Sequence, residues 1–319
     1  MIIGPEGPGY RFIQQYEHGL PTGRKDLAQC VDAYVEFLLD ASGQEDLPPV
    51  ELEPIYDQFS LQAKEGDFKE ASLGIEGANL AEMGMIVFDS SDIQTRQRFT
   101  QAHELLECLI VALEGNRYSS TLEPYFEGKK KERLCNWGAA RLLMPKDLFQ
   151  KSIREHGIGI DAAERIARVF KTSRLATLRH MVNCYPKRCG LIIWKRAHKP
   201  TESVPSPNQA ELWDDLEGTG GPQKEVRVQW KDLGRKARKE VYVPEDKSVD
   251  SDSLIARALE EGEAKSGRER VELGDLKGTF EIEAVPFTAG DDPHVLSLFH
   301  WPAEMFAGQE AQSGFSGTH

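Results

Sequence analysis

The stretch "RFTQAHELLECLI", residues 98–110, constrains the fold more than any other part of the chain. Its apolar residues recur at spacings of three and four, which predicts one continuous face of a helix over about residues 92–113. His103 and Glu107 fall on that same face. Because an ionised carboxylate facing a core costs several kcal/mol unless it is paired or bound to a cation, the two polar side chains need a common partner.

A divalent metal ion is one such partner, since a His nitrogen and a Glu oxygen at positions i and i+4 can converge on one ion. Glu104 lies about 100° around the helix from this pair. In the zinc-protease motif His-Glu-x-x-His, the glutamate acts as general base toward a metal-bound water. Glu107 stands where that motif has its second histidine. The other interpretation is a hydrogen-bonded His103–Glu107 pair at the edge of a core, and four letters alone do not separate the two.

A second helix, predicted over residues 131–144 and ended by Pro145, supplies a further carboxylate. Glu132 heads an apolar stripe that also contains Cys135. Catalytic zinc sites commonly have three protein ligands and leave the fourth coordination position open. Here two of those ligands would come from one helix and the third from the next. Glu132 is therefore the predicted third ligand, while Cys135 is interpreted as a small core residue, with metal ligation the lesser alternative.

Three segments, in order, resemble the ImmA/IrrE family of metallopeptidases over about residues 50–195: "QRFTQAHELLECL", "ERLCNWGAARLLMP" and "IARVFKTSRLATLRHMV". That family typically has Arg-Phe-Thr-x-Ala-His-Glu-x-x-His, followed by a glutamate at the head of a helix that ends Leu-Leu-Met-Pro. The matching residues are Arg98, Phe99, Thr100, Ala102, His103, Glu104, Glu132, Asn136, Ala139, Leu142, Leu143, Met144 and Pro145.

The resemblance implies an α+β fold: a mostly helical, minimal zincin-like metallopeptidase domain with a small sheet. It implies one metal ion held by His103, Glu132 and, in the altered position, Glu107, with Glu104 as base. Zinc is the expected ion, and a site with two carboxylates also suits manganese or iron. A second anionic ligand should weaken the Lewis acidity of the ion. We expect the site to be retained, because two unpaired acids at one buried spot would repel.

The function implied is that of a metal-dependent endopeptidase-like protein. Some family members cleave a helix-turn-helix repressor and so switch on stress, phage or mobile-element genes, which makes a transcriptional repressor the expected protein substrate. Residues 1–50 carry no repressor-like helix-turn-helix, so the repressor is expected to be a separate polypeptide. The alternative is a catalytically inactive sensor or protein-binding module on the same scaffold.

A length of 319 residues suits more than one domain. We predict an N-terminal helical extension (1–50), the metallopeptidase domain (51–198), a linker rich in Pro, Ser and Gly (199–223), a small α+β domain (224–303) and a disordered tail (304–319). The α+β domain is expected from the strand-like runs "EVRVQW", "KEVYV", "TFEIEAV" and "HVLSLF" and one helix over 251–264. It carries no recognisable chemistry, and the resemblance suggests a regulatory role for it.

The net charge of −13 argues against a general nucleic-acid binder. Residues 165–199, however, hold ten basic and no acidic side chains, so this segment is +10 and the rest of the chain −23. Its helix-turn-helix rhythm would allow contact with DNA or with an acidic partner. The preferred interpretation is the last helical pair of the protease domain, because a basic face alone is only an electrostatic footprint.

The remaining features point to a cytoplasmic protein without a membrane partner. The chain has no apolar run of about 18 residues and no signal-peptide pattern. Its five cysteines are irregularly spaced, which favours reduced thiols. His156, His180 and the lysines of 129–131 are expected on the surface or in solvated loop.

Overall fold

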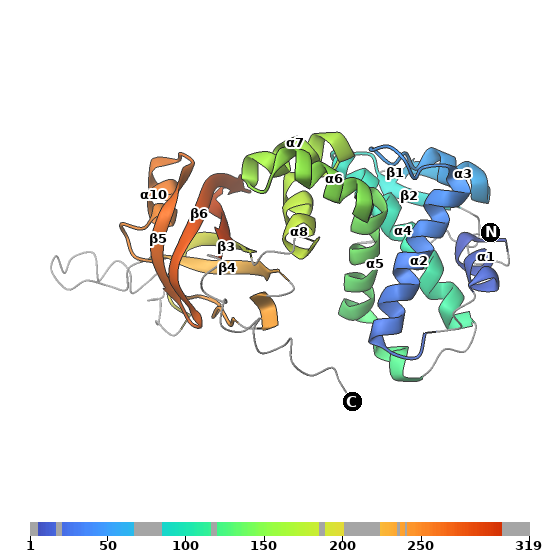
Figure 1. Cartoon of the computed structure of the whole chain (residues 1–319), viewed down its shortest axis with the longest axis horizontal. Coiled ribbons are helices and arrows are strands. Elements are labelled where there is room, and N and C mark those ends of the chain that lie inside the picture. Colours follow the sequence, from blue (N-terminus) through green and yellow to red (C-terminus); the bar gives the residue numbers. More distant parts are fainter. Residues whose placement is uncertain are drawn as a thin grey trace, which may run out of the picture. The chain divides into compact units, whose positions relative to one another are not determined.

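The computed structural model describes residues 6–16, 21–66, 85–115, 120–184, 189–200, 224–234, 237–239 and 241–301. The chain divides into two compact units (Figure 1). The first comprises Met1–Gly157 and Ala162–His180, and the second comprises Ile158–Asp161 and Met181–His319. Each unit has a hydrophobic core of its own, and the predicted α+β class is confirmed.

The first unit is mainly helical. Its elements are α1 (Pro8–Gln15), α2 (Arg24–Ser42), α3 (Glu53–Phe59), β1 (Gln62–Gly66), β2 (Met85–Asp89), α4 (Gln94–Gly115), the 3-10 helix η2 (Ser120–Tyr125), α5 (Gly128–Leu143) and α6 (Lys146–His156), together with most of α7 (Ile160–Phe170) and α8 (Arg174–Cys184). Strands β1 and β2 pair in parallel as a small two-stranded sheet. Strand β2 is built from the compact apolar run Met85–Phe88, three residues of which are buried or nearly so, whereas the β1 side chains are mostly exposed.

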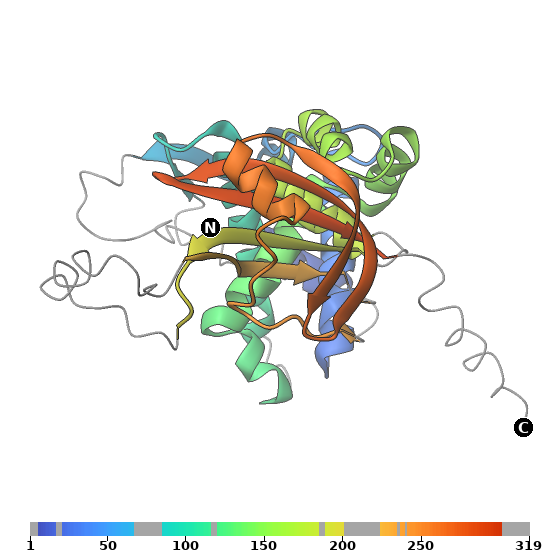
Figure 2. The same ribbon diagram turned by 90° about the vertical axis from the view of Figure 1, so that its left-hand side faces the viewer.

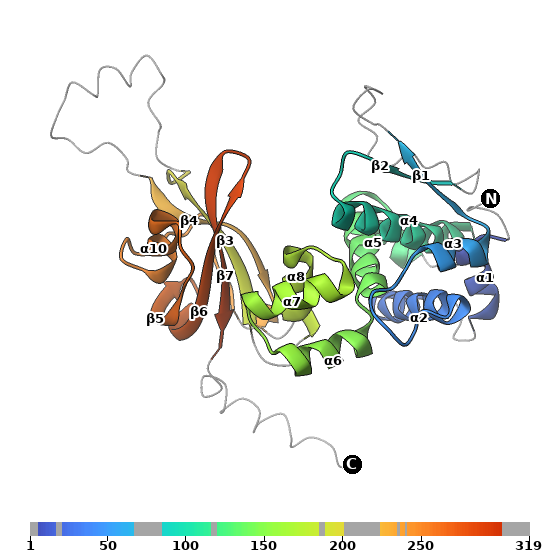
Figure 3. The ribbon, with the colours of Figure 1, turned by 90° about the horizontal axis from the view of Figure 1, so that it is seen from above.

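Helix α4 packs against α1, α5 and β2 (Figure 3). Its side chains Ala102, Leu106 and Ile110 are at most 1% exposed, so the apolar face predicted from their spacing is confirmed. The approach of α5 is close, because a Cβ added at Gly138 would lie 2.4 Å from the Leu106 side chain. Glycine at that position lets the two helices meet where the polar residues of α4 lie.

The predicted N-terminal helical extension, residues 1–50, contributes α1 and α2 to the same core as α4 and α5. The apolar stripe of α2 has to be buried somewhere, and it packs with the side chains of α4 and α5. The Tyr34 hydroxyl donates a hydrogen bond of 2.9 Å to the carbonyl of Leu105. In α1, a Cβ added at Gly9 would lie 2.0 Å from the Cys108 carbonyl oxygen. Helix α1 therefore lies directly on α4.

The second unit contains an antiparallel five-stranded sheet with the order β4-β3-β7-β6-β5. The strands are β3 (Cys189–Ala197), β4 (Glu225–Leu233), β5 (Lys265–Leu273), β6 (Leu276–Ala289) and β7 (Asp292–His300). Helix α10 (Leu254–Glu261) packs against β5, β6 and β7, and Figure 2 shows it lying across the twisted sheet. A short 3-10 helix, η3 (Ala237–Lys239), follows β4.

The domain boundary predicted at residue 198 is too late, because β3 lies inside this sheet. It pairs with β4 on one side and β7 on the other. Trp194 is fully buried, and its ring nitrogen donates a 2.7 Å hydrogen bond to the Ser297 hydroxyl. A continuous apolar run such as "GLIIW" suits a strand covered on both faces, and such a strand belongs to the middle of a sheet.

Three of the four predicted strand runs of this unit are confirmed as β4, β6 and β7, and the helix predicted over 251–264 is α10. The fourth, "KEVYV", is wrong. In its described part Tyr242 is 62% exposed, and its backbone bonds to the Asp275 turn rather than to a strand ladder. Strand β5 was missed because its sequence, "KSGRERVEL", alternates mostly polar and charged residues on an exposed edge.

Most of the predicted linker (199–223) and the predicted tail (304–319) lie outside the described residues. Among the helices that are described, none is both long and apolar enough to cross a membrane.

Candidate metal centre

Helices α4 and α5 bring together His103, Glu107 and Glu132, the three predicted ligands. The His103 Nε2 atom lies 3.5 Å from Glu107 Oε1 and 3.7 Å from Glu132 Oε2. Two ligand atoms that each sit about 2.1 Å from a tetrahedral ion are about 3.4 Å apart. The two distances measured from His103 are therefore close to those of a bound pair, and we call His103, Glu104, Glu107 and Glu132 the candidate metal centre.

The ligand side chains differ in exposure. His103 and Glu107 are 13% and 15% exposed, whereas Glu132 is 57% exposed. The two buried ligands, His103 and Glu107, come from α4, and the exposed ligand, Glu132, comes from the first turns of α5. The centre is therefore closed by the protein on the α4 side and open to solvent on the side of Glu132. An ion held by His103 and Glu107 would be reached from solvent past Glu132.

Asn136 orients the His103 ring. Its Oδ1 lies 3.2 Å from His103 Nδ1, so it accepts a hydrogen bond when that nitrogen carries the proton. A hydrogen bond at one ring nitrogen fixes the tautomer and leaves the other free to bind metal. The nitrogen left free is Nε2, the one that faces the two carboxylates. Asn136 appeared in the sequence only as a match to the family pattern, one turn after Glu132, and its role could not be read from spacing alone.

Lys131 is the residue at this centre that the sequence missed. It was expected in a solvated loop, but it lies in the second turn of α5, is 25% exposed, and places Nζ 3.0 Å from Glu107 Oε1. Burial would lower the pKa of Lys131, but the hydrogen bond and charge of Glu107 outweigh burial and raise it. Each carboxylate oxygen has two lone pairs, so Glu107 retains acceptor capacity beside Lys131.

The charges of the centre are mutually dependent. Burial would raise the pKa of Glu107, but hydrogen bonds from His103 and Lys131 lower it below its ordinary value. Burial would lower the pKa of His103, but the Glu107 hydrogen bond and the Glu104 charge raise it. Without a metal ion, His103 and Lys131 therefore stabilise the ionised form of Glu107.

Glu104 lies beside this pair and is half-buried. Burial, followed by the charge of Glu107, raises its pKa to about 7. A carboxyl group with a pKa near the working pH can accept and return a proton efficiently, which is what a general base requires. The sequence predicted Glu104 as the general base only from its place in the motif, and that role stays a prediction.

Cys135 lies on the buried side of the centre. Donor atoms of His103, Glu107 and Cys135 all fall within 4.8 Å of one another. The Cys135 side chain is 1% exposed, and burial with the charge of Glu107 raises the pKa of its thiol. Nitrogen, oxygen and sulfur donors gathered in this way fit a zinc-type ion.

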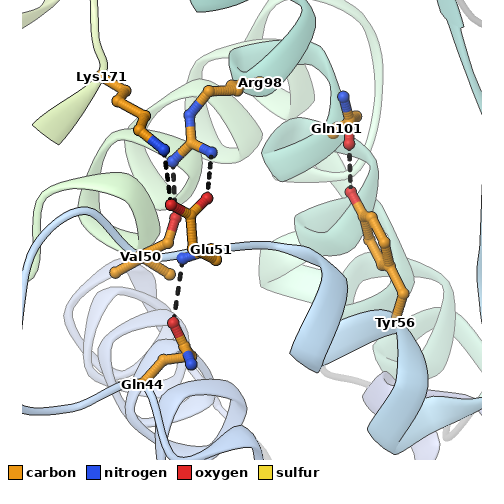
Figure 4. Close-up of polar contacts among 7 residues, drawn as sticks. All are labelled: Gln44, Val50, Glu51, Tyr56, Arg98, Gln101 and Lys171. Atoms are coloured by element: carbon orange, nitrogen blue, oxygen red, sulfur yellow. Dashed lines mark hydrogen bonds and ion pairs between the residues drawn. The ribbon is translucent and has the colours of Figure 1, made fainter.

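A second polar cluster lies on another face of α4 and lines a cavity of about 580 Å³ (Figure 4). Glu51 accepts from Arg98 at 3.2 Å and from Lys171 at 2.6 Å, while Arg98 also donates to the Val50 carbonyl. Tyr56 donates to Gln101. The cluster joins α4 to the segment before α3 and to the turn after α7. Lys171, one of the basic residues of 165–199, is thus neutralised within the first unit.

The His180 side chain, expected on the surface, is buried in the first unit. Its ring meets the Phe149 ring edge-on, with centroids 4.6 Å apart. Burial, followed by the charge of Arg141, lowers the pKa of His180 to about 3. This histidine is neutral and structural, and it has no access to a substrate.

Comparison with known proteins gives three likenesses. Residues 58–181 match the model of the IrrE N-terminal-like domain. A stretch of 107 residues is 35% identical to the radiation response metalloprotease IrrE of Deinococcus deserti, covering 32% of this chain and 37% of that protein. The chain therefore spans little more than a third of this curated relative. A transcriptional regulator of Mycobacterium tuberculosis has a similar fold, with a TM-score of 0.52, 11% identity, and coverage of 90% of this chain and 80% of that one.

Proposed function

We propose, from the membership of residues 58–181 in the IrrE N-terminal-like family, that this protein is a metal-dependent endopeptidase. One observation carries the proposal: His103 Nε2 on α4 lies 3.5 Å from Glu107 and 3.7 Å from Glu132 of α5, with Glu104 next to His103 in the helix. The group is unlike a chance cluster of surface acids, because His103 and Glu107 are mostly buried on the stripe that faces the core.

In this proposal His103, Glu107 and Glu132 hold a divalent ion. When bound, the ion supplies Lewis acidity that polarises a peptide carbonyl and makes a water molecule a better nucleophile. Glu104 removes a proton from the water as its oxygen attacks the carbonyl carbon. The same carboxyl group then returns the proton to the departing amine nitrogen as the C–N bond breaks. The raised pKa of Glu104 supports both transfers near neutral pH.

Lys131 supports activity in a site with two carboxylates. A second anionic ligand would reduce the Lewis acidity of the ion, compared with a site that has two histidines. The ammonium group 3.0 Å from Glu107 offsets that charge. The Glu107–Lys131 pair carries no net charge, as a neutral histidine would, while a carboxylate lone pair stays available to the ion.

The substrate we propose is a regulatory protein such as a helix-turn-helix repressor. The resemblance to the ImmA/IrrE family supports this, and so does the relative from Deinococcus deserti, which is a radiation response metalloprotease. A role in stress-responsive transcription follows from that proposal. Zinc is the proposed ion, and its chemistry agrees with the nitrogen and oxygen donors of the centre and with the Cys135 sulfur that lies close to them.

The test has two steps on the purified full-length chain. Metal analysis is expected to find one divalent ion per chain. Glu104→Gln should keep that ion and abolish cleavage of a co-expressed repressor, because an amide cannot accept the proton. A folded protein without metal would overturn the proposal and favour an inactive sensor or binding module, in which Glu107 is only the structural partner of His103 and Lys131.

A further inference from the structure

We propose that Cys135 is a further ligand of this metal ion, on the buried side of the candidate metal centre. The inference rests on the proposed function, since it needs the ion to be present. Its basis is geometric: donor atoms of His103, Glu107 and Cys135 lie within 4.8 Å of one another. For a tetrahedral ion, a nitrogen and a sulfur ligand are about 3.6 Å apart, so small side-chain rotations bring the three donors into contact with it.

The geometry of α5 explains why Cys135 can reach the ion. Positions i and i+3 lie on one face of a helix, one turn apart, so Glu132 and Cys135 both face α4. Helix α4 comes close at this level because Gly138, one turn after Cys135, lets the Leu106 side chain approach. Glu132 is 57% exposed and Cys135 is 1% exposed, so the two donors approach the ion from opposite sides.

The surroundings of Cys135 contain the groups that a metal–thiolate site needs. His103 supplies a nitrogen already oriented by Asn136, and Glu107 supplies an oxygen. On binding, the ion takes the place of the thiol proton, the sulfur–metal bond forms, and the proton leaves to solvent. Cys108 makes a useful contrast. It is also buried, but its Sγ donates to the backbone carbonyl of Glu104 and is not part of the donor cluster.

A sulfur ligand changes two properties of the centre. Thiolate is a soft donor and selects zinc, cobalt or cadmium over manganese or magnesium. It also completes a set of three ligands, His103, Glu107 and Cys135, on the protein side. Glu132, the exposed carboxylate, then becomes the ligand that can leave to open the fourth position to a substrate.

Cobalt substitution tests the inference. The full chain is loaded with Co²⁺ and its near-ultraviolet absorption is measured, since a thiolate ligand gives a sulfur-to-cobalt charge-transfer band. We expect the band in the wild type, in Cys108→Ser and in Glu132→Gln, and its loss in Cys135→Ser with cobalt still bound. Cobalt bound to the wild type without the band would overturn the inference and leave the proposed function standing. A wild type that binds neither cobalt nor zinc would overturn both.

A second measurement needs no variant. X-ray absorption at the zinc edge of the wild-type chain is expected to resolve one sulfur at about 2.3 Å among nitrogen and oxygen ligands at about 2.0–2.2 Å. A first shell made only of nitrogen and oxygen would overturn the assignment of Cys135, even if Cys135→Ser failed to fold.

Discussion

At the scale of single residues, the unusual feature of this protein is the carboxylate of Glu107 in a place where the zinc-protease motif has histidine. The structure places two hydrogen-bonding partners beside this carboxylate, His103 and Lys131. Their hydrogen bonds outweigh the effect of burial and keep the pKa of Glu107 low. The carboxylate is therefore ionised and ready to bind a metal ion at neutral pH.

Glu107→His tests whether this position holds metal. The change restores the usual motif, so zinc affinity is expected to stay at least at the wild-type level, measured by competition with a coloured chelator. The control is Glu155→His on the exposed surface of α6, which makes the same chemical change away from the centre. A folded Glu107→His protein that has lost zinc would contradict the assignment of Glu107 as a ligand.

Lys131→Met tests the second partner of Glu107. Without the ammonium group, nothing competes with the metal for Glu107 Oε1 and no like charge opposes the ion, so zinc affinity should rise. Lys130→Met is the matched control, because Lys130 is exposed and lies over the Tyr125 ring rather than at the centre. If zinc affinity fell instead, Lys131 would be a residue that positions Glu107 for the metal.

At the scale of elements, close helix packing brings the centre together. Gly9 lets α1 lie on the backbone of α4, and Gly138 lets α5 approach Leu106. His180 of α8 is also buried, with its ring edge-on against Phe149 of α6, and burial keeps it neutral. Because burial disfavours the protonated form of His180, the stability of this helix packing depends on pH.

The His180 contact predicts a loss of stability in mild acid. Unfolded histidine takes up a proton near pH 6.5, but folded His180 does so only near pH 3. Between these values the unfolded state binds more protons. Stability is therefore intact above about pH 6.5 and falls as the pH drops toward 3, by at most about 1.4 kcal/mol per pH unit. Urea unfolding at pH 7.5 and pH 5 should show a smaller loss for His180→Gln than for wild type.

His156→Gln, at the end of α6, serves as the control, because that side chain is not fully buried. Equal acid sensitivity of wild type and His180→Gln would refute the link between His180 and stability.

At the scale of the whole molecule, strand β3 belongs to the second unit, although the boundary predicted at residue 198 assigned it to the metallopeptidase domain. Strand β3 follows α8 directly, yet it lies between β4 and β7 in the sheet of the second unit. The sheet therefore includes residues on both sides of the segment 201–223. A unit built from distant parts of a chain cannot be separated by a cut at its most polar stretch.

Two fragments of the second unit, one with β3 and one without it, test where the domain boundary lies. Residues 181–303 should unfold cooperatively on heating, measured by circular dichroism, because they contain every strand of the sheet. Residues 199–303 should not, since β4 and β7 would both lose their shared partner and the buried Trp194. Cooperative melting of the shorter fragment would instead support the boundary at residue 198.

Local pattern determined much of this protein from the sequence alone. Helical spacing sets which side chains share a face, so the stripe of α4, the pairing of His103 with Glu107 and the place of Glu132 at the head of the α5 stripe all follow from the order of the residues. The helices predicted over about 92–113 and 131–144, observed as α4 and α5, follow for the same reason, from periodicity and, for the second, from the proline that ends it. The family resemblance rests on these same local motifs.

Tertiary structure alone decided the contacts between elements that are distant in sequence. No spacing rule relates Lys131 to Glu107 across two helices, or Cys135 to His103, because those distances depend on how closely α5 approaches α4. Strand pairing is equally non-local, so the place of β3 between β4 and β7 could not be read from the run "GLIIW". Periodicity describes one element at a time, whereas the donor set of a metal ion and the middle of a sheet are properties of several elements packed together.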